Sequence, residues 1–485
     1  MINLYKIRID AFMSILFIVS LNFIFNIIDF ASYIDAFYIA MAIVSIFVTV
    51  ITIRYGCKIN GTIFNFVSIF LALSYIFTFG QVILQALFVC SGNAGYRIVI
   101  DYYGKKETIY ALKIIFMIYS ALCVGLILSG KNDQNLKVIT RTEFSSSEIN
   151  QAYKDQKFAM RIILMTFPIR VLTDTLILLA GFSGGFASSG SMTSSIPDIV
   201  ISYGNFSIIG LALLVFSLRT NKRKQTLTFF AVTAYFCLMM LNGRRSETVA
   251  YLCIIGLIYL STNKKPKIGK VLFLCLLTYI FLAGLYSVVL MRTYHATYSI
   301  AIFLECFLDS LTTRNIILEV LREYGNTCYT PISVIVNWLP TYGPTWGTSY
   351  YFGIFAVFIN FFGIPGKLTR QSCYGLTLQN TPGMLSSYYV NIGGSIYGEW
   401  LFNFGIIGAA IIAIIMGILI GKLSRKANEM MLFGEGTKLA YCVPLMTSIL
   451  YWIRDYFSGG IRELVWGILF VCLTSKILVS KRKNN

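Results

Sequence analysis

Long apolar runs separated by short polar stretches make up most of the chain, and twelve of them have about the length of a membrane-spanning helix. About 20 apolar residues cross a bilayer core of ~30 Å at ~1.5 Å per residue. Two neighbouring runs are shorter and are joined by a polar turn. The pattern predicts an all-α polytopic membrane protein with about twelve transmembrane helices. They lie approximately at residues 11–30, 36–53, 62–89, 109–128, 159–180, 198–217, 226–241, 247–261, 271–290, 396–420, 439–457 and 464–480.

One stretch, residues 291–395, departs from this pattern. It contains five of the nine prolines, the only histidine and two of the five tryptophans. Because such a varied composition does not suit lipid, we expect a folded cap on one face of the bundle, between the ninth and tenth spans. This divides the chain into nine N-terminal transmembrane helices (1–290), the cap (291–395) and three C-terminal transmembrane helices (396–485).

Composition also predicts local features. Residues 300–311 of the cap are expected to be helical, and the apolar segments 331–339 and 352–362 are too short to span and are expected along the interface. Residues 181–195 are rich in Ser and Gly and predict a second outer loop. The polar linker 129–158 is expected on the opposite, cytoplasmic side and to be partly helical.

Basic residues are distributed unequally between the two sides of the predicted bundle. The N-terminus, the C-terminal tail and the loops on their side hold 26 of the 40 Lys and Arg residues. Since cytoplasmic loops carry an excess of Lys and Arg, both termini are predicted to be cytoplasmic. The cap then faces outward.

Composition excludes several classes of protein. The chain is 57% hydrophobic and 13% charged, whereas soluble domains are about 25% charged. The net charge is +19, and most of the basic residues lie on the predicted cytoplasmic side, where they set the orientation in the membrane. Nucleic acid is therefore not expected as a partner. With one histidine, no C-x-x-C pair and no nucleotide-binding glycine motif, the sequence predicts neither a metal site nor a cofactor.

The basic residues that remain, in the spans and on the outer side, are mostly arginine. Positive charge on the outer side opposes the excess of Lys and Arg that orients the protein, so the presence of these arginines needs another explanation. A guanidinium group binds phosphate or carboxylate through two parallel hydrogen bonds, and an ammonium group does not. Anion binding and pairing with neighbouring acids are the two interpretations. The residues are Arg97, Arg170, Arg244, Arg245, Arg292, Arg314, Arg322, Arg370, Arg454 and Arg462.

Three groups of arginines are the strongest binding candidates. Arg244 and Arg245 lie in the Asn-Gly-Arg-Arg-Ser-Glu turn between the two short spans, beside a helix N-terminus that favours an anion. Arg454 and Arg462 flank a glycine turn in the last outer hairpin, each followed directly by an acid. Arg170 is four residues from Asp174 in the fifth span, where an ion pair is either functional or self-neutralising.

The entry and exit of the cap carry further candidates. Arg292 and His295 follow the ninth span, and His295 is the only side chain that ordinarily titrates near neutral pH. Glu399 stands where the chain re-enters the membrane. Either His295 or Glu399 could accept a proton from a sugar hydroxyl, or each could be structural. Trp338 and Trp346 in the cap could form an aromatic wall for sugars or belong to an interfacial aromatic belt.

Residues 398–408, Gly-Glu-Trp-Leu-Phe-Asn-Phe-Gly-Ile-Ile-Gly, followed by an apolar run, resemble the re-entry segment of bacterial O-antigen polymerases, the Wzy-type oligosaccharide repeat-unit polymerases. The arginine turn, the large outer loop and the late outer Arg are also similar. The resemblance implies a GT-C-like, metal-independent glycosyltransferase in the bacterial inner membrane. It implies functional outer arginines at Arg244, Arg245, Arg292 and Arg454.

Such an enzyme joins oligosaccharide units carried on undecaprenyl diphosphate at the outer leaflet, producing a surface polysaccharide such as O-antigen or capsule. Besides that substrate and the membrane lipids, a chain-length regulator is a candidate partner. Two alternatives stay open. An O-antigen ligase shares donor and architecture, and a flippase for lipid-linked oligosaccharides commonly has twelve spans, although this chain lacks the internal repeat that transporters tend to show.

Overall fold

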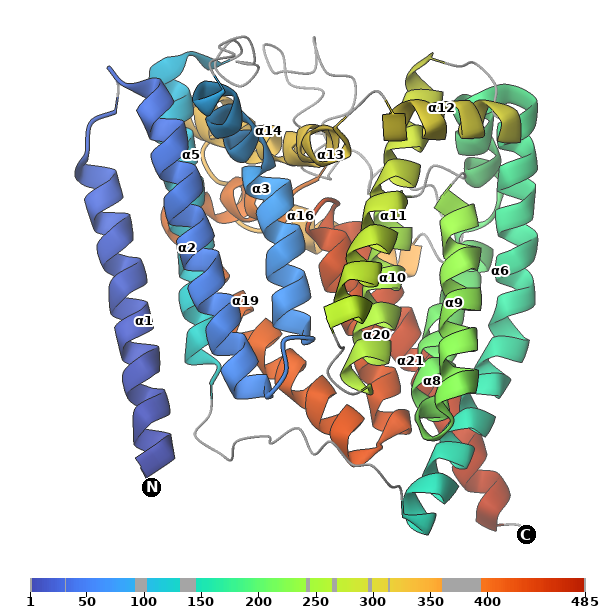
Figure 1. Cartoon of the computed structure of the whole chain (residues 1–485). Coiled ribbons are helices and arrows are strands. Elements are labelled where there is room, and N and C mark those ends of the chain that lie inside the picture. Colours follow the sequence, from blue (N-terminus) through green and yellow to red (C-terminus); the bar gives the residue numbers. More distant parts are fainter. Residues whose placement is uncertain are drawn as a thin grey trace.

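The computed structural model describes residues 2–30, 32–91, 103–130, 145–240, 245–263, 268–294, 299–312, 315–359 and 394–483 (Figure 1). These residues form helices joined by short turns, and they contain no β-strand. The helices are α1 (Ile2–Ile27), α2 (Ile34–Asn60), α3 (Phe66–Cys90), α5 (Lys105–Leu128), α6 (Ser146–Ser195), α7 (Asp198–Asn205), α8 (Ser207–Ser217), α9 (Lys222–Met239), α10 (Arg245–Ser261), α11 (Ile268–Tyr294), α12 (Ile300–Thr312), α13 (Ile316–Gly325), α14 (Tyr329–Ser333), α15 (Leu339–Tyr342), α16 (Thr348–Ile359), α19 (Ile396–Phe433), α20 (Gly436–Trp452) and α21 (Phe457–Lys483).

The predicted fold class is confirmed. Within the described residues, eight helices are long and apolar enough to cross a membrane, and the helices over 246–261 and 276–291 are shorter and also apolar. Each of the twelve predicted spans overlaps a helix. The number that cross the bilayer, and the GT-C-like relationship, stay predictions.

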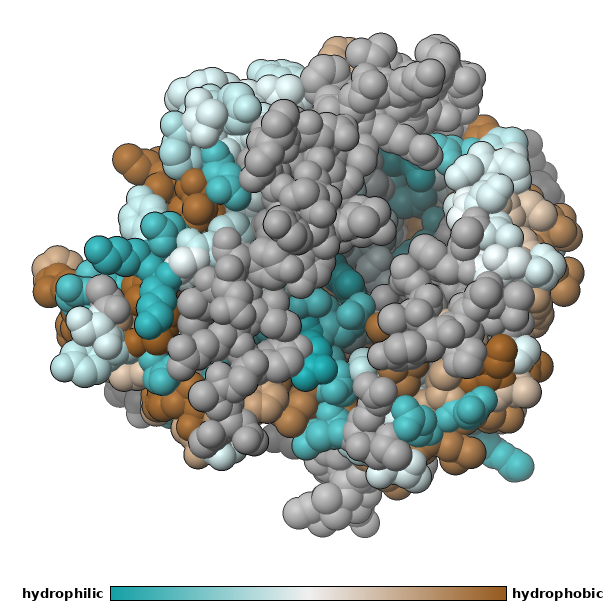
Figure 2. Space-filling model, turned by 90° about the horizontal axis from the view of Figure 1, so that it is seen from above, coloured by the Kyte–Doolittle hydropathy of each residue, from teal (hydrophilic) through white to brown (hydrophobic). Residues whose placement is uncertain are grey.

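Figure 1 places both ends of the chain on the same side of the bundle, with α12, α13 and α14 on the opposite side. This arrangement agrees with a cap that faces away from both termini. Seen from the cap side, hydrophilic residues lie deep at the centre of the molecule (Figure 2). Which side faces the cytoplasm stays a prediction from the distribution of Lys and Arg.

The predicted outer loop at 181–195 is wrong, because the segment is helical on both sides of a two-residue break. Helical geometry fails only at Gly184 and Gly185, and Gly185 has a φ of 70°. After this break the chain resumes as a helix that folds back, since the Ser189 hydroxyl donates to the Ile177 carbonyl at 3.3 Å. Serines such as Ser194 donate to backbone carbonyls one turn earlier, which is how a helix accommodates them. Composition indicated a loop, but only the two glycines interrupt the helix.

The other local predictions have mixed outcomes. The helix expected at 300–311 is confirmed as α12. The segment 331–339 is helical too, through α14, a π-helical turn and α15. Helix α16 covers 352–359, and the rest of that segment, like 360–393, lies outside the described residues. The linker is helical from Ser146, where Ser145 and Glu148 form a capping box. In the cap, Cys328 has a free and buried thiol.

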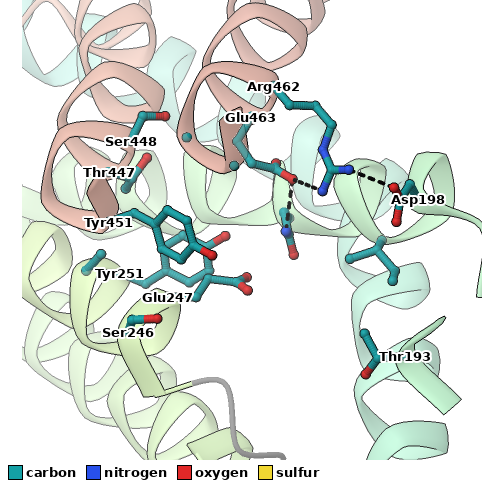
Figure 3. A pocket seen from close by; sticks show the side chains of 15 residues that line it. Thr193, Asp198, Ser246, Glu247, Tyr251, Thr447, Ser448, Tyr451, Arg462 and Glu463 are labelled. Carbon is teal, nitrogen blue, oxygen red and sulfur yellow. Dashed lines mark hydrogen bonds and ion pairs between the residues drawn. The ribbon is translucent and has the colours of Figure 1, made fainter. Parts of the chain in front are cut away.

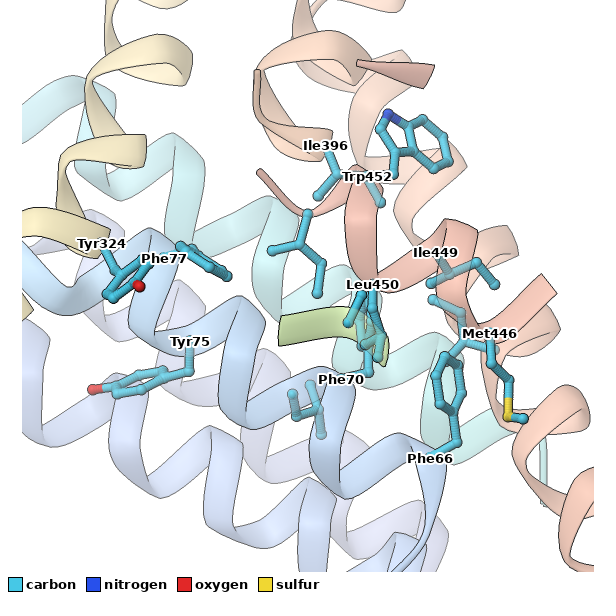
Figure 4. Packing of buried hydrophobic residues seen from close by; sticks show 14 of the residues in the cluster. Phe66, Phe70, Tyr75, Phe77, Tyr324, Ile396, Met446, Ile449, Leu450 and Trp452 are labelled. Carbon is cyan, nitrogen blue, oxygen red and sulfur yellow. The ribbon is translucent and has the colours of Figure 1, made fainter. Parts of the chain in front are cut away.

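A core of apolar side chains lies between α3, α13, α19 and α20. Phe66, Phe70 and Phe77 project from α3 towards Met446 and Leu450 of α20 and towards α13 and α19 (Figure 4). Burial of such side chains from each helix fixes the upper part of α20, which carries residues of the candidate site.

Helix α19 also packs against α5, and glycines bring their backbones together. A Cβ atom at Gly125 would overlap the carbonyl of Ile414, and one at Gly417 would overlap the carbonyl of Leu122. Gly417 and Gly421 are four residues apart and face the same helix, as in the small-residue motifs that let membrane helices approach closely. The position of α19, and so of the residues at its start, depends on this contact.

We expect Gly417→Ala to lower the free energy of unfolding by about 1–3 kcal/mol, because the added methyl group must push two backbones apart. Gly256→Ala is the matched control, since a Cβ atom at Gly256 of α10 meets no atom within 4 Å. That control should be neutral or slightly stabilising. Thermal unfolding of the purified variants in detergent gives the measurement. An unchanged melting temperature for Gly417→Ala would contradict close packing of α5 and α19.

Candidate functional site

The first part of the site is made by a break in α19. Gly405 has a φ of 67°, which glycine adopts without the strain of a Cβ atom. At the end of the short helix before the break, backbone carbonyls are turned towards donors outside that helix. Two of them, of Phe402 and Asn403, accept hydrogen bonds from the backbone N–H groups of Thr345 and Trp346, at 3.0 and 2.8 Å. The segment before α16 is thereby fixed to the start of α19.

Glu399 lies in this short helix and is 1% exposed. Its Oε1 accepts a hydrogen bond from the Ser349 hydroxyl at 2.7 Å. Its Oε2 accepts from the indole Nε1 of Trp452 at 2.6 Å and from the backbone N–H of Phe457 at 3.0 Å. One buried carboxylate therefore connects α16, the end of α20 and the start of α21.

Asn403 supports the same arrangement one turn later. Its side-chain Nδ2 donates to the Ser349 hydroxyl and to the Glu399 carbonyl, both at 2.7 Å, and its Oδ1 accepts from the Ser349 N–H at 3.2 Å. All three side chains are buried. A buried polar network with each member hydrogen-bonded specifies one geometry, so the Glu399 carboxylate has a fixed orientation.

The second part of the site is an ion-pair network around Arg170 of α6, which is 2% exposed. Its Nε lies 2.6 Å from Asp174 Oδ2 and one terminal nitrogen lies 2.8 Å from Glu247 Oε1 of α10. The same nitrogen donates to Asn205 Oδ1. The predicted pair with Asp174 is confirmed, and the structure adds Glu247 from another helix. A guanidinium group buried this deeply is stable only with such partners.

This network borders a cavity of about 260 Å³, which we call the polar cavity (Figure 3). Its lining comes from the end of α6, α7, the start of α10, the end of α20 and the start of α21. It therefore lies towards the side opposite the termini. Its ionisable lining residues are Asp198, Glu247, Tyr251, Tyr451, Arg462 and Glu463.

Arg462 supplies the second guanidinium group. It lies 2.8 Å from Asp198 Oδ2 and 4.0 Å from Glu463 Oε1. Glu463 Oε1 also accepts from the Ser202 hydroxyl at 3.0 Å and from Asn205 Nδ2 at 3.3 Å. Asn205 thus links the Arg170 network to the Arg462 network, and the two lie on one cavity.

The ion-paired side chains around the polar cavity carry more negative than positive charge. The two guanidinium groups of Arg170 and Arg462 pair with four carboxylates, those of Asp174, Asp198, Glu247 and Glu463. An anionic ligand would therefore need further positive charge nearby. In sequence, the closest additional arginines are those of the turn that directly precedes Ser246 and Glu247 of the cavity lining.

Several predicted residues lie outside the described structure. Arg244 and His295 are among them, and at Arg245 and Arg292 only the backbone is described. Arg245 is the first residue of α10, so its backbone is one residue from the cavity lining. Their functional roles stay predictions.

Four other predicted residues, Arg454, Glu399, Trp338 and Trp346, are described and do not line the polar cavity, whereas Arg97, Arg314 and Arg370 lie outside the described residues. Arg454 contacts Glu323 at 3.9 Å and the rings of Tyr324 and Phe77 at 5.0 and 5.8 Å, so it faces α13 and α3. Trp338 is buried against Tyr342 and Phe402. Trp346 is 75% exposed and has a φ of 55°. The structure thus groups Arg170 with Arg462 and places Arg454, Glu399 and both tryptophans elsewhere.

Sequence reasoning missed the acids as cavity residues. Glu247 was only part of the arginine turn, and Glu463 was only a neighbour of Arg462. One signal was available: Glu247 and Tyr251 are four residues apart and so share a helix face. The pairing of that face with Arg170 depends on tertiary contacts between α6 and α10, which no local pattern reports.

Fold and site together define a polytopic helical membrane protein with ion-paired residues enclosed near one end of its bundle. Comparison with known families matches residues 11–484 to the family described as O-antigen polysaccharide polymerase Wzy. The chain belongs to this family, which confirms the family predicted from the sequence. Neither a curated protein nor a solved structure matches the chain. The family supports a polymerising activity of the glycosyltransferase type on lipid-linked oligosaccharide repeat units, in a multi-pass membrane protein.

Proposed function

We propose that the protein polymerises undecaprenyl-diphosphate-linked oligosaccharide repeat units into a surface polysaccharide, O-antigen or capsule, at the outer leaflet of the bacterial inner membrane. The observation that carries this proposal is the family match over nearly the whole chain. The structure adds a polar cavity on the side away from both termini, where the substrate would lie if the termini are cytoplasmic.

The reaction requires no external energy source, because the lipid diphosphate is an activated leaving group. The growing chain leaves its diphosphate and passes to a hydroxyl of the next lipid-linked unit. The enzyme must stabilise negative charge on the departing diphosphate and accept a proton from the acceptor hydroxyl. In this proposal the arginines of the 242–246 turn supply the positive charge, next to a cavity whose own Arg462 and neighbouring Arg170 are ion-paired with carboxylates, and the chemistry uses no metal ion.

The proposal distinguishes two carboxylates. Glu463 lines the polar cavity beside Arg462, so it is placed to accept the acceptor proton. Glu399 is buried with hydrogen bonds to both oxygens, and we assign it a positioning role. His295 stays the alternative base predicted from sequence.

The direct test uses the purified protein in liposomes with chemically defined undecaprenyl-diphosphate-linked repeat units. A ladder of polymer, formed also in the presence of a chelator, is the expected result. Single units transferred to a lipid A core would instead indicate a ligase. Units that move between leaflets without joining would indicate a flippase.

In the same assay, Arg244→Lys and Arg245→Lys should each lower the rate of polymer formation about 10–100-fold. Lysine keeps the charge but loses the paired hydrogen bonds of the guanidinium group, and a charged hydrogen bond contributes about 1.5–3 kcal/mol. Arg223→Lys, at an exposed position in the first turn of α9, is the control and should retain full activity. Full-length polymer from the double lysine variant would count heavily against binding of diphosphate by this turn.

A further inference from the structure

A second cavity, of about 310 Å³, lies between α19, α20 and α21, and its lining is almost entirely apolar. We call it the apolar groove. Its aliphatic walls come from Met416, Leu419 and Leu423 of α19, Leu445 and Ile449 of α20 and Leu464 of α21. Leu419 is 52% exposed, so the groove is bordered by a side chain on the apolar outer surface of the bundle, where lipid is the surrounding medium.

The apolar groove adjoins the polar cavity. Ser448 of α20 and Gly460 of α21 line both spaces. At this shared wall the helices are close, since a Cβ atom at Gly460 would lie 3.1 Å from the Ser448 carbonyl oxygen. The absence of a side chain at Gly460 keeps the wall thin. The two spaces are therefore separated only by the contact of α20 with α21 at these residues, and a ligand with its ends in both would pass beside this contact.

Glu399 fixes the aromatic end of the groove, which is formed by Trp452 and Phe457. Trp452 and Phe457, which line it, are the two residues whose indole N–H and backbone N–H donate to Glu399 Oε2. Their rings lie 5.2 Å apart, centroid to centroid. Because the Trp452 indole nitrogen is already hydrogen-bonded, it presents no free donor to the groove. The groove is thus rigid at its aromatic end and suited to hydrocarbon.

The two spaces differ sharply in charge. The polar cavity carries Asp198, Glu247, Arg462 and Glu463, whereas the described lining of the groove has no ionisable residue. Their combination fits an amphiphile with a polar head, such as a sugar, and a long hydrocarbon chain. Lipid-linked oligosaccharides, on which this family acts, have that form.

We propose that the apolar groove holds the polyprenyl chain of the lipid-linked repeat unit whose head group occupies the polar cavity. This inference rests on the proposed function and extends it by assigning the lipid part of the substrate to α19, α20 and α21. Burial of the chain next to Ser448 and Gly460 orients the diphosphate towards the cavity. Glu399 shapes the groove without contact with the reacting atoms.

The first test fills the groove. Leu419→Trp should raise KM about tenfold for substrates on a full-length polyprenyl carrier, the effect of excluding roughly two methylene groups from apolar contact. KM should not change for the same sugar on a short isoprenoid carrier that does not reach Leu419. Ile411→Trp is the matched control, on the same helix, 54% exposed and outside the groove, and should leave both values unchanged. Equal effects of Leu419→Trp on both carriers, or none, would overturn the assignment.

The second test requires neither a variant nor turnover. Undecaprenyl diphosphate with a photoreactive group in its isoprenoid chain is irradiated with the wild-type protein in liposomes, and labelled peptides are identified by mass spectrometry. Labels within 416–423 and 445–464 that disappear with excess unlabelled undecaprenyl diphosphate support the inference. Labels elsewhere, or labels that survive competition because phospholipid fills the groove, overturn it. A wild-type protein that shows competed labels but forms no polymer would refute the proposed function and leave the groove assignment standing.

Discussion

Replacing Arg170 by alanine should abolish polymer formation and lower the free energy of unfolding by about 3–5 kcal/mol. The guanidinium group is 2% exposed and is the charge partner of Asp174 and Glu247. Without it, two carboxylates face each other in a buried environment, where a lone charge is far less stable than in water. The polar cavity would lose the wall that Glu247 forms.

Two controls separate stability from function. Arg161→Ala, on the same helix at an exposed position, should change neither the melting temperature nor the polymer yield. Combining Arg170→Met with Asp174→Asn and Glu247→Gln removes all three charges, and such neutral replacements often recover the stability of a buried ion network. We expect that triple variant to fold and still make no polymer. Normal polymer from it would show that the network is structural only.

A second large effect is expected at Glu399, where alanine and glutamine should differ. Glu399→Ala leaves the Trp452 indole N–H and the Phe457 backbone N–H buried without an acceptor. At about 1–3 kcal/mol for each unsatisfied group, the variant should lose about 2–6 kcal/mol of stability and most of its activity. Thermal unfolding and the liposome polymerisation assay give the two measurements.

Glu399→Gln decides between a positioning residue and a base. The glutamine Oε1 can accept from both N–H groups, and its Nε2 can donate to the Ser349 hydroxyl, which would then accept where it now donates. The two N–H groups therefore keep their acceptor. A positioning role predicts near-normal KM and kcat for this variant. A general base contributes about 10²–10⁴-fold to rate, so a loss of that size in kcat, with an unchanged melting temperature, would restore Glu399 as the catalytic carboxylate.

Much of the fold follows from local pattern. Each predicted span overlaps a helix because an apolar run of sufficient length has few alternatives in a bilayer. The pair between Arg170 and Asp174 was also accessible, since residues four apart share a helix face. The helix across 186–195 could not be predicted, because Ser and Gly favour loops in general and packing in the folded protein overrides that preference.

The candidate site was predicted only in part. Arg170 and Arg462 were singled out separately, and their connection through Asn205 depends on how α7 packs between α6 and α21. The role of Glu399 in holding Trp452 and Phe457 depends on the break at Gly405, whose φ the sequence does not reveal. The apolar groove is formed by three helices whose side chains are ordinary lipid-facing residues when each is considered alone.

The close approach of Gly125 to Ile414 has a consequence for biosynthesis. At about 5–20 residues per second, the ribosome needs roughly 15–60 s to proceed from α5 to the part of α19 that packs on it. During that interval the N-terminal helices lie in the bilayer with their glycine surface uncovered by its final neighbour. Nascent chains stalled before α19 would therefore be incomplete bundles. In that state they would be exposed to cleavage by quality-control proteases of the membrane.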